Sequence, residues 1–281
     1  MDLILEITKF FFYTIIIIVV SKYILVNLLR NFAESLNLKP KVVGNIAGVA
    51  TSIPELLTIS LASITGLIYT GIYNVISSNV INLILYLFST VYNKNVKILR
   101  NIAIRIDLIL VIITIIIPML LIKLKLESNI GIVPIFIILF FIFYFINIRT
   151  HKHYLNKYEK IIAQNIIIEE KYKRNKTKLI VKYSMYIILV GIILFFIGNL
   201  LSNTLESLCR SFNIAESLMG IVLGFATSIP ELITFFESQK HNKNNSNDIL
   251  GVIESTNNLL TSNMLNLFII QSIGILLISI F

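Results

Sequence analysis

Two glutamates lie within an identical seven-residue phrase that occurs twice in the chain. The phrase ATSIPEL ends at Leu56 and again at Leu232, so Glu55 and Glu231 stand in stretches that are otherwise apolar. An ionised carboxylate at the centre of a bilayer costs about 3 kcal/mol on insertion scales, and such groups usually serve function. The duplicated glutamates are therefore the first candidates for chemistry.

Further oxygen-bearing side chains accompany each glutamate at helical spacing. Four hydroxyls belong to the repeated phrase itself: Thr51, Ser52, Thr227 and Ser228. Two downstream phrases, NVISSNVIN and NLLTSNMLN, add polar residues at every fourth position: Asn74, Ser78, Asn82, Asn258, Ser262 and Asn266. Carboxylate, hydroxyl and amide oxygens suit hard cations such as Ca²⁺ or Na⁺. The alternative is that these small polar residues only join neighbouring helices, which explains one stripe better than a duplicated Pro-Glu pair.

The charge of the two carboxylates favours exchange over simple binding. Two like charges that lie close together repel, so a site without an ion is expected to bind protons or cations. Their two negative charges match one Ca²⁺, or a combination of Na⁺ and protons. One occupant must then replace another before the site can cross a lipid barrier, which favours antiport and leaves the counter-ion open.

The composition indicates a polytopic helical membrane protein. The 281 residues are 56% apolar and only 14% charged, and the mean hydropathy is +0.86. A helix of about 20 residues crosses a bilayer, and continuous apolar runs without period-two alternation favour helices over a barrel. Eight spans are expected, at about 3–29, 40–65, 70–92, 104–124, 130–148, 179–203, 215–237 and 250–279.

The distribution of basic residues predicts the orientation in the membrane. Most of the 24 lysines and arginines fall in loops on one side, which explains the net charge of +9. Basic loops mark the cytoplasmic face, so the N-terminus is expected outside a cell membrane and the 150–178 loop inside. This basic connector is expected to hold a short surface helix, and no nucleic acid partner is expected.

The two halves of the chain read as an inverted repeat. We place the first half at 1–149, with its repeat at about 40–92, and the second at 179–281, with its repeat at about 215–279. The alignment also matches Gly48 with Gly224. By the charge rule the two copies run in opposite directions, an arrangement typical of secondary transporters with a midplane site. Pro54 and Pro230 are expected to interrupt their helices, because proline lacks a backbone N–H.

Other reactive residues are assigned ordinary roles. Nothing points to an enzyme, to a cofactor or to a site built from Cys209 and histidines. His151 and His153 are expected in a solvated loop, and Asp107 near a span end, where its side chain reaches water.

At these motifs the chain resembles the cation/Ca²⁺ antiporter superfamily, and within it the prokaryotic Na⁺/Ca²⁺ exchangers. That family carries a G-[ST]-S-x-P-E phrase followed by S-N-x-x-[ND] in both halves. The resemblance implies that Glu55 and Glu231, with Thr51 and Thr227, hold Ca²⁺. It implies Na⁺ sites built from the remaining hydroxyls and amides with two backbone carbonyls: Ser52, Ser228, Ser78, Ser262, Asn82, Asn266, Gly48 and Gly224. It also implies alternating access, in which the first and sixth spans slide against a static core.

This sequence departs from the family pattern at three places. Alanine opens each phrase at Ala50 and Ala226 where the family has glycine, and Asn266 stands where many members have aspartate. The family has ten helices, and counterparts of the fourth and fifth spans are not found in the second half, so a homo-oligomer or a helix-completing partner is left open. The predicted function is Ca²⁺/Na⁺ antiport. The alternatives are H⁺/Ca²⁺ or K⁺-dependent exchange, or a non-transporting cation-binding membrane protein.

Overall fold

The computed structural model describes residues 3–25, 27–29, 31–32, 39–64, 68–154, 176–211, 215–244 and 248–280. Within these ranges every regular element is helical. This follows from the composition, because a backbone in lipid must form its hydrogen bonds within its own segment. The expected all-α fold is confirmed. The surface helix expected within 150–178 falls mainly on residues outside those ranges.

The helices follow the chain with bounds close to the expected spans. In order, they are α1 (Leu3–Val19), η1 (Val20–Leu25), α3 (Pro40–Thr51), α4 (Ile53–Ile64), α5 (Ile68–Tyr92), η2 (Val96–Arg100), α6 (Ile102–Lys123), η3 (Ile130–Ile132), α7 (Val133–Tyr154), α9 (Lys176–Ser211), α10 (Glu216–Thr227), α11 (Ile229–Asn244), α12 (Asp248–Met264), η5 (Leu265–Ile270) and α13 (Gln271–Ile280). Over the described residues, seven helical stretches are long and apolar enough to cross a membrane. The remaining expected span corresponds to α1 and η1, where α1 has 17 residues.

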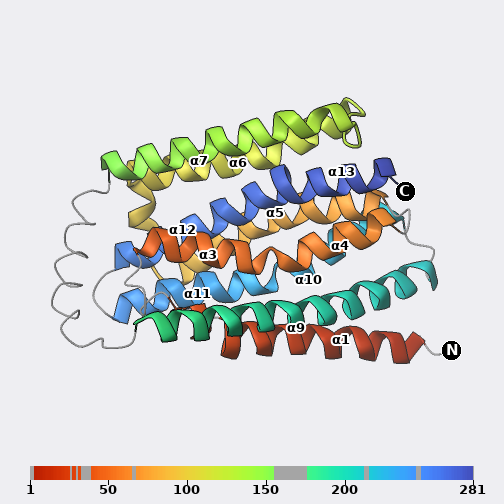
Figure 1. Cartoon of the computed structure of the whole chain (residues 1–281), viewed down its shortest axis with the longest axis horizontal. Coiled ribbons are helices and arrows are strands. Elements are labelled where there is room, and N and C mark those ends of the chain that lie inside the picture. Colours follow the sequence, from red (N-terminus) through yellow and green to blue (C-terminus); the bar gives the residue numbers. More distant parts are fainter. Residues whose placement is uncertain are drawn as a thin grey trace.

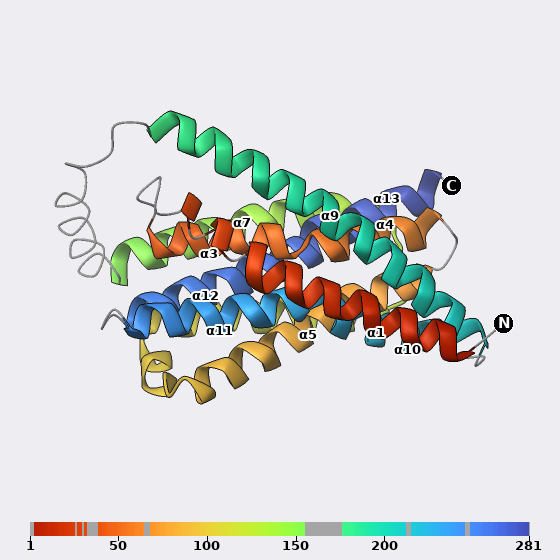
Figure 2. The same cartoon turned by 90° about the horizontal axis from the view of Figure 1, so that it is seen from below.

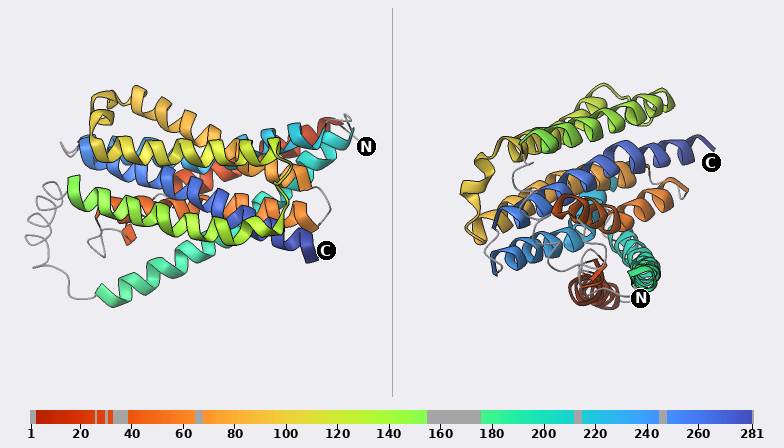
Figure 3. Two further views of the ribbon diagram at one scale, coloured as in Figure 1. Left: turned by 90° about the horizontal axis from the view of Figure 1, so that it is seen from above. Right: turned by 60° about the vertical axis from the view of Figure 1, so that its left-hand side comes forward.

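The helices form three groups that lie side by side. Figure 1 shows α6 and α7 along one edge and α1 with α9 along the opposite edge. The elements that carry the repeated motifs, α3–α4, α5, α10–α11 and α12–α13, fill the space between them (Figures 1 and 3). Both chain termini lie at the same end of the array (Figures 1 and 2), which agrees with an even number of crossings.

Both copies of the repeated phrase interrupt a helix, as predicted. The first break lies at Ser52, with φ −84° and ψ 1°, and the second at Ser228, with φ −81° and ψ 1°. Proline follows two residues later in each copy, and its missing N–H removes one bond of the helical ladder. The same sequence therefore produces the same local geometry twice, and it places the N-termini of α4 and α11 in the middle of the molecule.

Glycines allow the two repeats to pack closely against each other. Helix α3 of the first repeat crosses α12 of the second, and α10 crosses α5. A Cβ atom on Gly44 would lie 2.1 Å from the backbone oxygen of Glu254, and one on Gly220 would lie 2.6 Å from that of Thr70. No side chain fits at either crossing without moving a helix. Gly44 and Gly220 thus fix the distance between the repeats.

Two residues that were expected to be exposed are buried, near the first residues of α6 and the last residues of α7. His151 was expected in a solvated loop, but α7 continues to Tyr154 and buries this imidazole. Asp107 was expected to reach water, but its side chain is fully buried on α6, where it meets His151. The partner of each residue lies on a different helix, so the pattern along one segment could not show the pairing. His153 is exposed, as expected.

Candidate ion-binding site

Glu55 and Glu231 lie together at the centre of the molecule. Both are 0% exposed. Each stands in the first turn of the helix that begins after a break, α4 for Glu55 and α11 for Glu231. A helix N-terminus carries a partial positive charge, which favours a carboxylate there. The two carboxylates are close enough to repel each other electrostatically, so the site requires compensating positive charge when both are ionised.

Hydroxyl groups from both repeats surround Glu231. Ser262 on α12 donates a hydrogen bond from Oγ to Oε1 of Glu231 at 3.1 Å. The Ser52 hydroxyl, at the break of the first repeat, lies 2.9 Å from the Ser262 hydroxyl, and the Thr51 hydroxyl lies beside the Glu231 carboxylate. The carboxylate of the second repeat is therefore reached by hydroxyls of the first.

The arrangement around Glu55 mirrors this one. The hydroxyls of Ser78 on α5 and Thr227 at the second break lie 3.4 Å apart and stand beside the Glu55 carboxylate. Thr227 also donates to Oδ1 of Asn74 at 3.3 Å. Each glutamate thus faces the hydroxyl that ends the broken helix of the opposite repeat, Thr51 for Glu231 and Thr227 for Glu55. The inverted repeat brings the two motifs into one site.

Several buried oxygen atoms around the carboxylates have no hydrogen-bond donor. Among the described residues, both carboxylate oxygens of Glu55, Oε2 of Glu231 and Oδ1 of Asn82 and Asn266 are in this state. Buried acceptors nearly always have a partner, because an unpaired one loses its hydration without compensation. A cluster of unsatisfied acceptors is therefore what a site for a positively charged ion requires.

Two asparagines that the sequence analysis did not single out hold the amides of this cluster. Asn82 donates from Nδ2 to Oδ1 of Asn263 at 3.2 Å, and Asn266 donates to Oδ1 of Asn79 at 3.1 Å. Asn79 and Asn263 in turn donate to each other's backbone oxygens, at 3.2 and 3.0 Å. Since the amide nitrogens are engaged in this way, the Oδ1 atoms of Asn82 and Asn266 remain free. Asn79 and Asn263 stand next to Ser78 and Ser262 in the repeated phrase, and this is the signal that could have identified them.

Replacing Asn79 or Asn263 by alanine is expected to weaken cation binding while leaving both carboxylates in place. Loss of a residue that orients an ion ligand typically lowers affinity about 10- to 100-fold. The change can be measured as the concentration of Ca²⁺ that half-maximally raises the unfolding temperature in detergent. Asn93→Ala is a matched control, because Asn93 is also a buried asparagine but follows the last residue of α5 and donates to the Ser89 carbonyl, away from the cluster. Unchanged affinity in both site variants would contradict an orienting role.

The remaining predicted site residues are close to the cluster but partly engaged. The Gly48 carbonyl accepts from the Ser52 hydroxyl at 2.8 Å, and the Gly224 carbonyl accepts from the Ser78 hydroxyl at 3.4 Å. Ser228 is buried and its Oγ has no partner. Asn258 donates to the Thr234 hydroxyl at 2.6 Å, and its Oδ1 is free. Each carbonyl oxygen has a second lone pair, so it can accept this hydrogen bond and still offer a lone pair to an ion.

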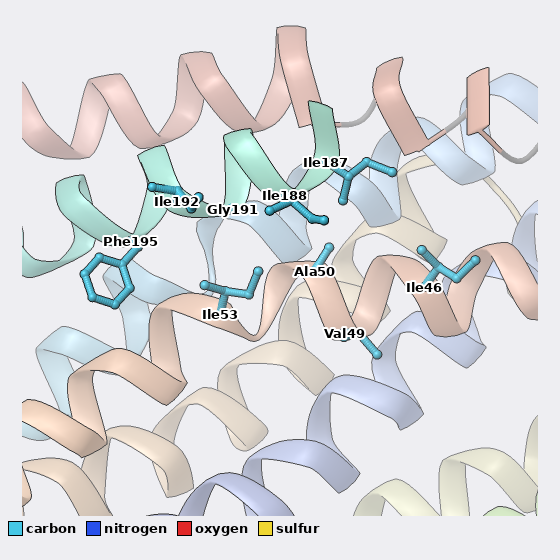
Figure 4. A pocket seen from close by; sticks show the side chains of 9 residues that line it. All are labelled: Ile46, Val49, Ala50, Ile53, Ile187, Ile188, Gly191, Ile192 and Phe195. Atoms are coloured by element: carbon cyan, nitrogen blue, oxygen red, sulfur yellow. The ribbon is translucent and has the colours of Figure 1, made fainter. Parts of the chain in front are cut away.

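The acidic composition of the site is limited to two groups. The described part of the chain contains no cluster of three or more His, Cys, Asp or Glu side chains able to hold a metal. The site therefore relies on two carboxylates and neutral oxygens, a composition that suits a hard ion which must also leave. A separate cavity of about 470 Å³ lies between the α3–α4 break and α9. Figure 4 shows that only apolar side chains line it, so it is not the ion site.

Comparison with known proteins places this geometry in a family. The model of the family described as "Sodium/calcium exchanger protein" matches residues 7–149 and 182–281. These ranges include both repeated phrases and the two downstream phrases. No curated protein matches the chain.

Solved structures of one exchanger share the fold. The chain superposes on the sodium-calcium exchanger NCX_Mj soaked with Na⁺ and no Ca²⁺ with a TM-score of 0.56 and 21% identity, over 98% of this chain and 84% of that one. The same exchanger soaked with Na⁺ and Sr²⁺ gives 0.56 and 20%, over 98% and 83%. A further structure of the sodium/calcium exchanger from Methanococcus jannaschii gives 0.55 and 19%, over 98% and 83%.

Proposed function

The chain belongs to the sodium/calcium exchanger protein family, and we propose that it exchanges Ca²⁺ for Na⁺ across the membrane by alternating access. It is a multi-span membrane transporter of the cation/Ca²⁺ exchange class. Its membrane, with the N-terminus outside and the 150–178 loop in the cytoplasm, is part of the proposal.

One observation carries the proposal: two buried, mutually repelling carboxylates from oppositely oriented repeats share a cluster of oxygen atoms without donors. Glu55 and Glu231 together supply two negative charges, which one Ca²⁺ neutralises. Na⁺ ions, or Na⁺ with a proton, neutralise them as well. A site left with two unbalanced charges is too costly to pass through the closed, dehydrated state. Transport in one direction therefore requires return of another cation, which is exchange.

The residues divide into two sets of roles in this proposal. Glu55 and Glu231, with the hydroxyls of Thr51 and Thr227, hold Ca²⁺. Na⁺ occupies positions built from neutral oxygens beside the carboxylates: Ser52, Ser228, Ser78, Ser262, Asn82 and Asn266, with the carbonyls of Gly48 and Gly224. Asn74 and Asn258 flank the site from the two sides. Because position 266 holds a neutral amide, no third carboxylate adds to the charge of this set.

The layout of the helices supports movement of α1 and α9 relative to the site. These two helices lie together at one edge, opposite α6 and α7 (Figure 1). Their contact with the first broken helix is made by apolar side chains, including Ile17, Ala50 and Leu194. Between α9 and the break lies the apolar cavity of Figure 4, bordered by Ile53 and Gly191. Apolar surfaces without directional bonds can slide past one another at small cost, whereas the glycine-packed crossings of the repeats cannot.

H⁺/Ca²⁺ exchange is the second candidate, because two buried carboxylates that repel each other can also be neutralised by protons. The two candidates differ in the gradient that drives Ca²⁺ movement.

Uptake of Ca²⁺ by proteoliposomes that contain the purified protein distinguishes Na⁺/Ca²⁺ exchange from H⁺/Ca²⁺ exchange. We expect an imposed Na⁺ gradient to drive uptake of radiolabelled Ca²⁺, with no uptake under a K⁺ or pH gradient of the same size. Uptake that follows the pH gradient and ignores Na⁺ would replace the proposal with H⁺/Ca²⁺ exchange. Saturable Ca²⁺ binding without flux under any gradient would show a cation-binding protein that does not transport.

A further inference from the structure

A second buried ionisable pair lies outside the candidate ion site. The Nε2 atom of His151 on α7 is 2.6 Å from Oδ2 of Asp107 on α6, and the side chains are 3% and 0% exposed. Neither residue belongs to a repeated phrase or has a role in the proposed exchange. At this distance a hydrogen bond joins the imidazole and the carboxylate.

Asparagine side chains connect this pair to the helix that carries half of the ion site. The Asn147 amide donates from Nδ2 to Oδ1 of Asp107 at 2.9 Å and to Oδ1 of Asn257 on α12 at 3.2 Å. Asn257 precedes Asn258 and lies on the same helix as Ser262. The α6–α7 hairpin is thus attached to α12 through Asn147, whose amide is also bonded to Asp107.

The charge of the pair depends on how many protons it holds. With one proton besides the N–H that a neutral imidazole already carries, the pair is neutral overall, either as an ion pair or as a neutral acid and a neutral base. Loss of that proton leaves one buried negative charge, and a second proton leaves one positive charge; either state costs several kcal/mol in a low-dielectric interior. A second proton also removes the carboxylate that Asn147 and His151 both bind.

Other ionisable groups near the pair are engaged or lie in solvent. From α5, Tyr86 faces Asp107, and its hydroxyl is bonded to Thr256 at 2.6 Å. From α12, the Glu254 carboxylate accepts from Ser238 at 2.6 Å. The basic side chains of α6, α7 and η2 at this end are exposed: Lys97, Arg100, Arg105, Arg149 and Lys152. Gain or loss of a proton by the Asp107–His151 pair is therefore what changes the charge at this position.

We propose that Asp107 and His151 form a proton-binding site, separate from the ion site, that controls the attachment of the α6–α7 hairpin to α12. With one proton bound, the hairpin holds α12 in the position in which Ser262 meets Glu231. Binding of a second proton breaks the Asp107–His151 pair, loosens the hairpin and slows exchange. The effect on exchange rests on the proposed function, and the effect on the attachment does not.

The test compares pH profiles of the maximal exchange rate at saturating Ca²⁺, which suppresses competition by protons at Glu55 and Glu231. In the wild type the rate is expected to fall about fivefold, a typical coupling between sites, as the pH is lowered from about 6 to 3. The second proton goes to the carboxylate of the pair rather than to the imidazole, and carboxylates ordinarily take up protons at about pH 4. Asp107→Asn/His151→Gln carries no titratable group and is expected to show a flat profile. His153→Gln, an exposed histidine two residues along α7, is the matched control and should follow the wild type. A double variant with the wild-type profile would overturn the proposal.

Two further measurements keep the result interpretable. Asn147→Leu leaves the pair intact but cuts its link to α12, so its rate profile should also be flat; a wild-type profile would contradict the linkage. Thermal unfolding in detergent needs no transport. The unfolding temperature of the wild type should fall more steeply on acidification than that of the double variant, whether or not the protein exchanges Ca²⁺. Equal slopes would exclude the proton site even if exchange itself is demonstrated.

Discussion

Glu231→Gln and Glu55→Gln are each expected to abolish Ca²⁺ exchange. Either change leaves Ca²⁺ facing one negative charge, so the bound state carries an unbalanced positive charge in a site with no exposure to water. Breaking a buried charge pair by removing one partner costs about 3–5 kcal/mol, which corresponds to a loss of affinity of roughly 100-fold or more. In the first variant the oxygen of the introduced amide can still accept from Ser262, so packing around the site is retained.

The prediction is measured in two ways, by Ca²⁺ flux in proteoliposomes and by Ca²⁺-dependent stabilisation in detergent. Glu6→Gln is the matched control, because Glu6 is a partly exposed glutamate on α1 bonded to Lys9 at 2.7 Å. Exposed ion pairs contribute about 0–1 kcal/mol, so this variant should bind and exchange like the wild type. Ca²⁺ affinity within about threefold of wild type in either site variant would mean that the ion binds elsewhere.

The fold was largely predictable because lipid imposes simple rules on a sequence. Long apolar runs had to be helices, and their expected ends differ from the observed ends by only a few residues at most positions. The proline two residues after Ser52 and Ser228 predicted both breaks. The close crossings were less accessible, because Gly44 can be recognised as a contact point only when Glu254, on a distant helix, is placed beside it.

The candidate site was predictable where its residues repeat and unpredictable where they meet across helices. Duplication singled out Glu55 and Glu231, and spacing added Ser262 beside them. Asn79 and Asn263 were overlooked because spacing along one helix does not show reciprocal bonds between two helices. The predicted exposure of Asp107 and His151 near span ends was wrong for a similar reason. Hydropathy places such groups near water, and only the fold reveals a partner that allows burial.

Gly48→Ala and Gly224→Ala are expected to damage the ion site without altering any polar side chain. A Cβ on Gly48 would lie 2.7 Å from the backbone oxygen of Asn258 and 3.0 Å from the backbone nitrogen of Ser262. A Cβ on Gly224 would lie 2.0 Å from Oγ of Ser77 and 2.8 Å from the backbone oxygen of Asn74. Backbone atoms cannot yield without moving α12 or α5, so overpacking should cost about 1–3 kcal/mol of folding stability in each variant.

The same displacement moves the oxygen atoms that face the ion. Pushing α12 away from α3 separates Ser262 from Ser52, and pushing α5 away from α10 separates Ser78 from Thr227. We therefore expect Ca²⁺ affinity to fall about tenfold or more in each variant, since one lost contact of about 1.4 kcal/mol has this effect. Gly198→Ala on α9 is the control, because a Cβ there has no atom within 4 Å. It should retain affinity and unfold at the same or a higher temperature.

The double variant Gly48→Ala/Gly224→Ala separates packing from binding. The two crossings involve different helix pairs, α3 with α12 and α10 with α5, so their costs in stability should add to within about 0.5 kcal/mol. Their effects on Ca²⁺ affinity should not add, because both displacements open the same oxygen cluster and the second removes contacts that the first has already weakened. Unfolding temperature and Ca²⁺ titration on the wild type, the two single variants and the double variant measure both quantities. Fully additive losses of affinity would mean that the two repeats bind cations independently rather than in one shared site.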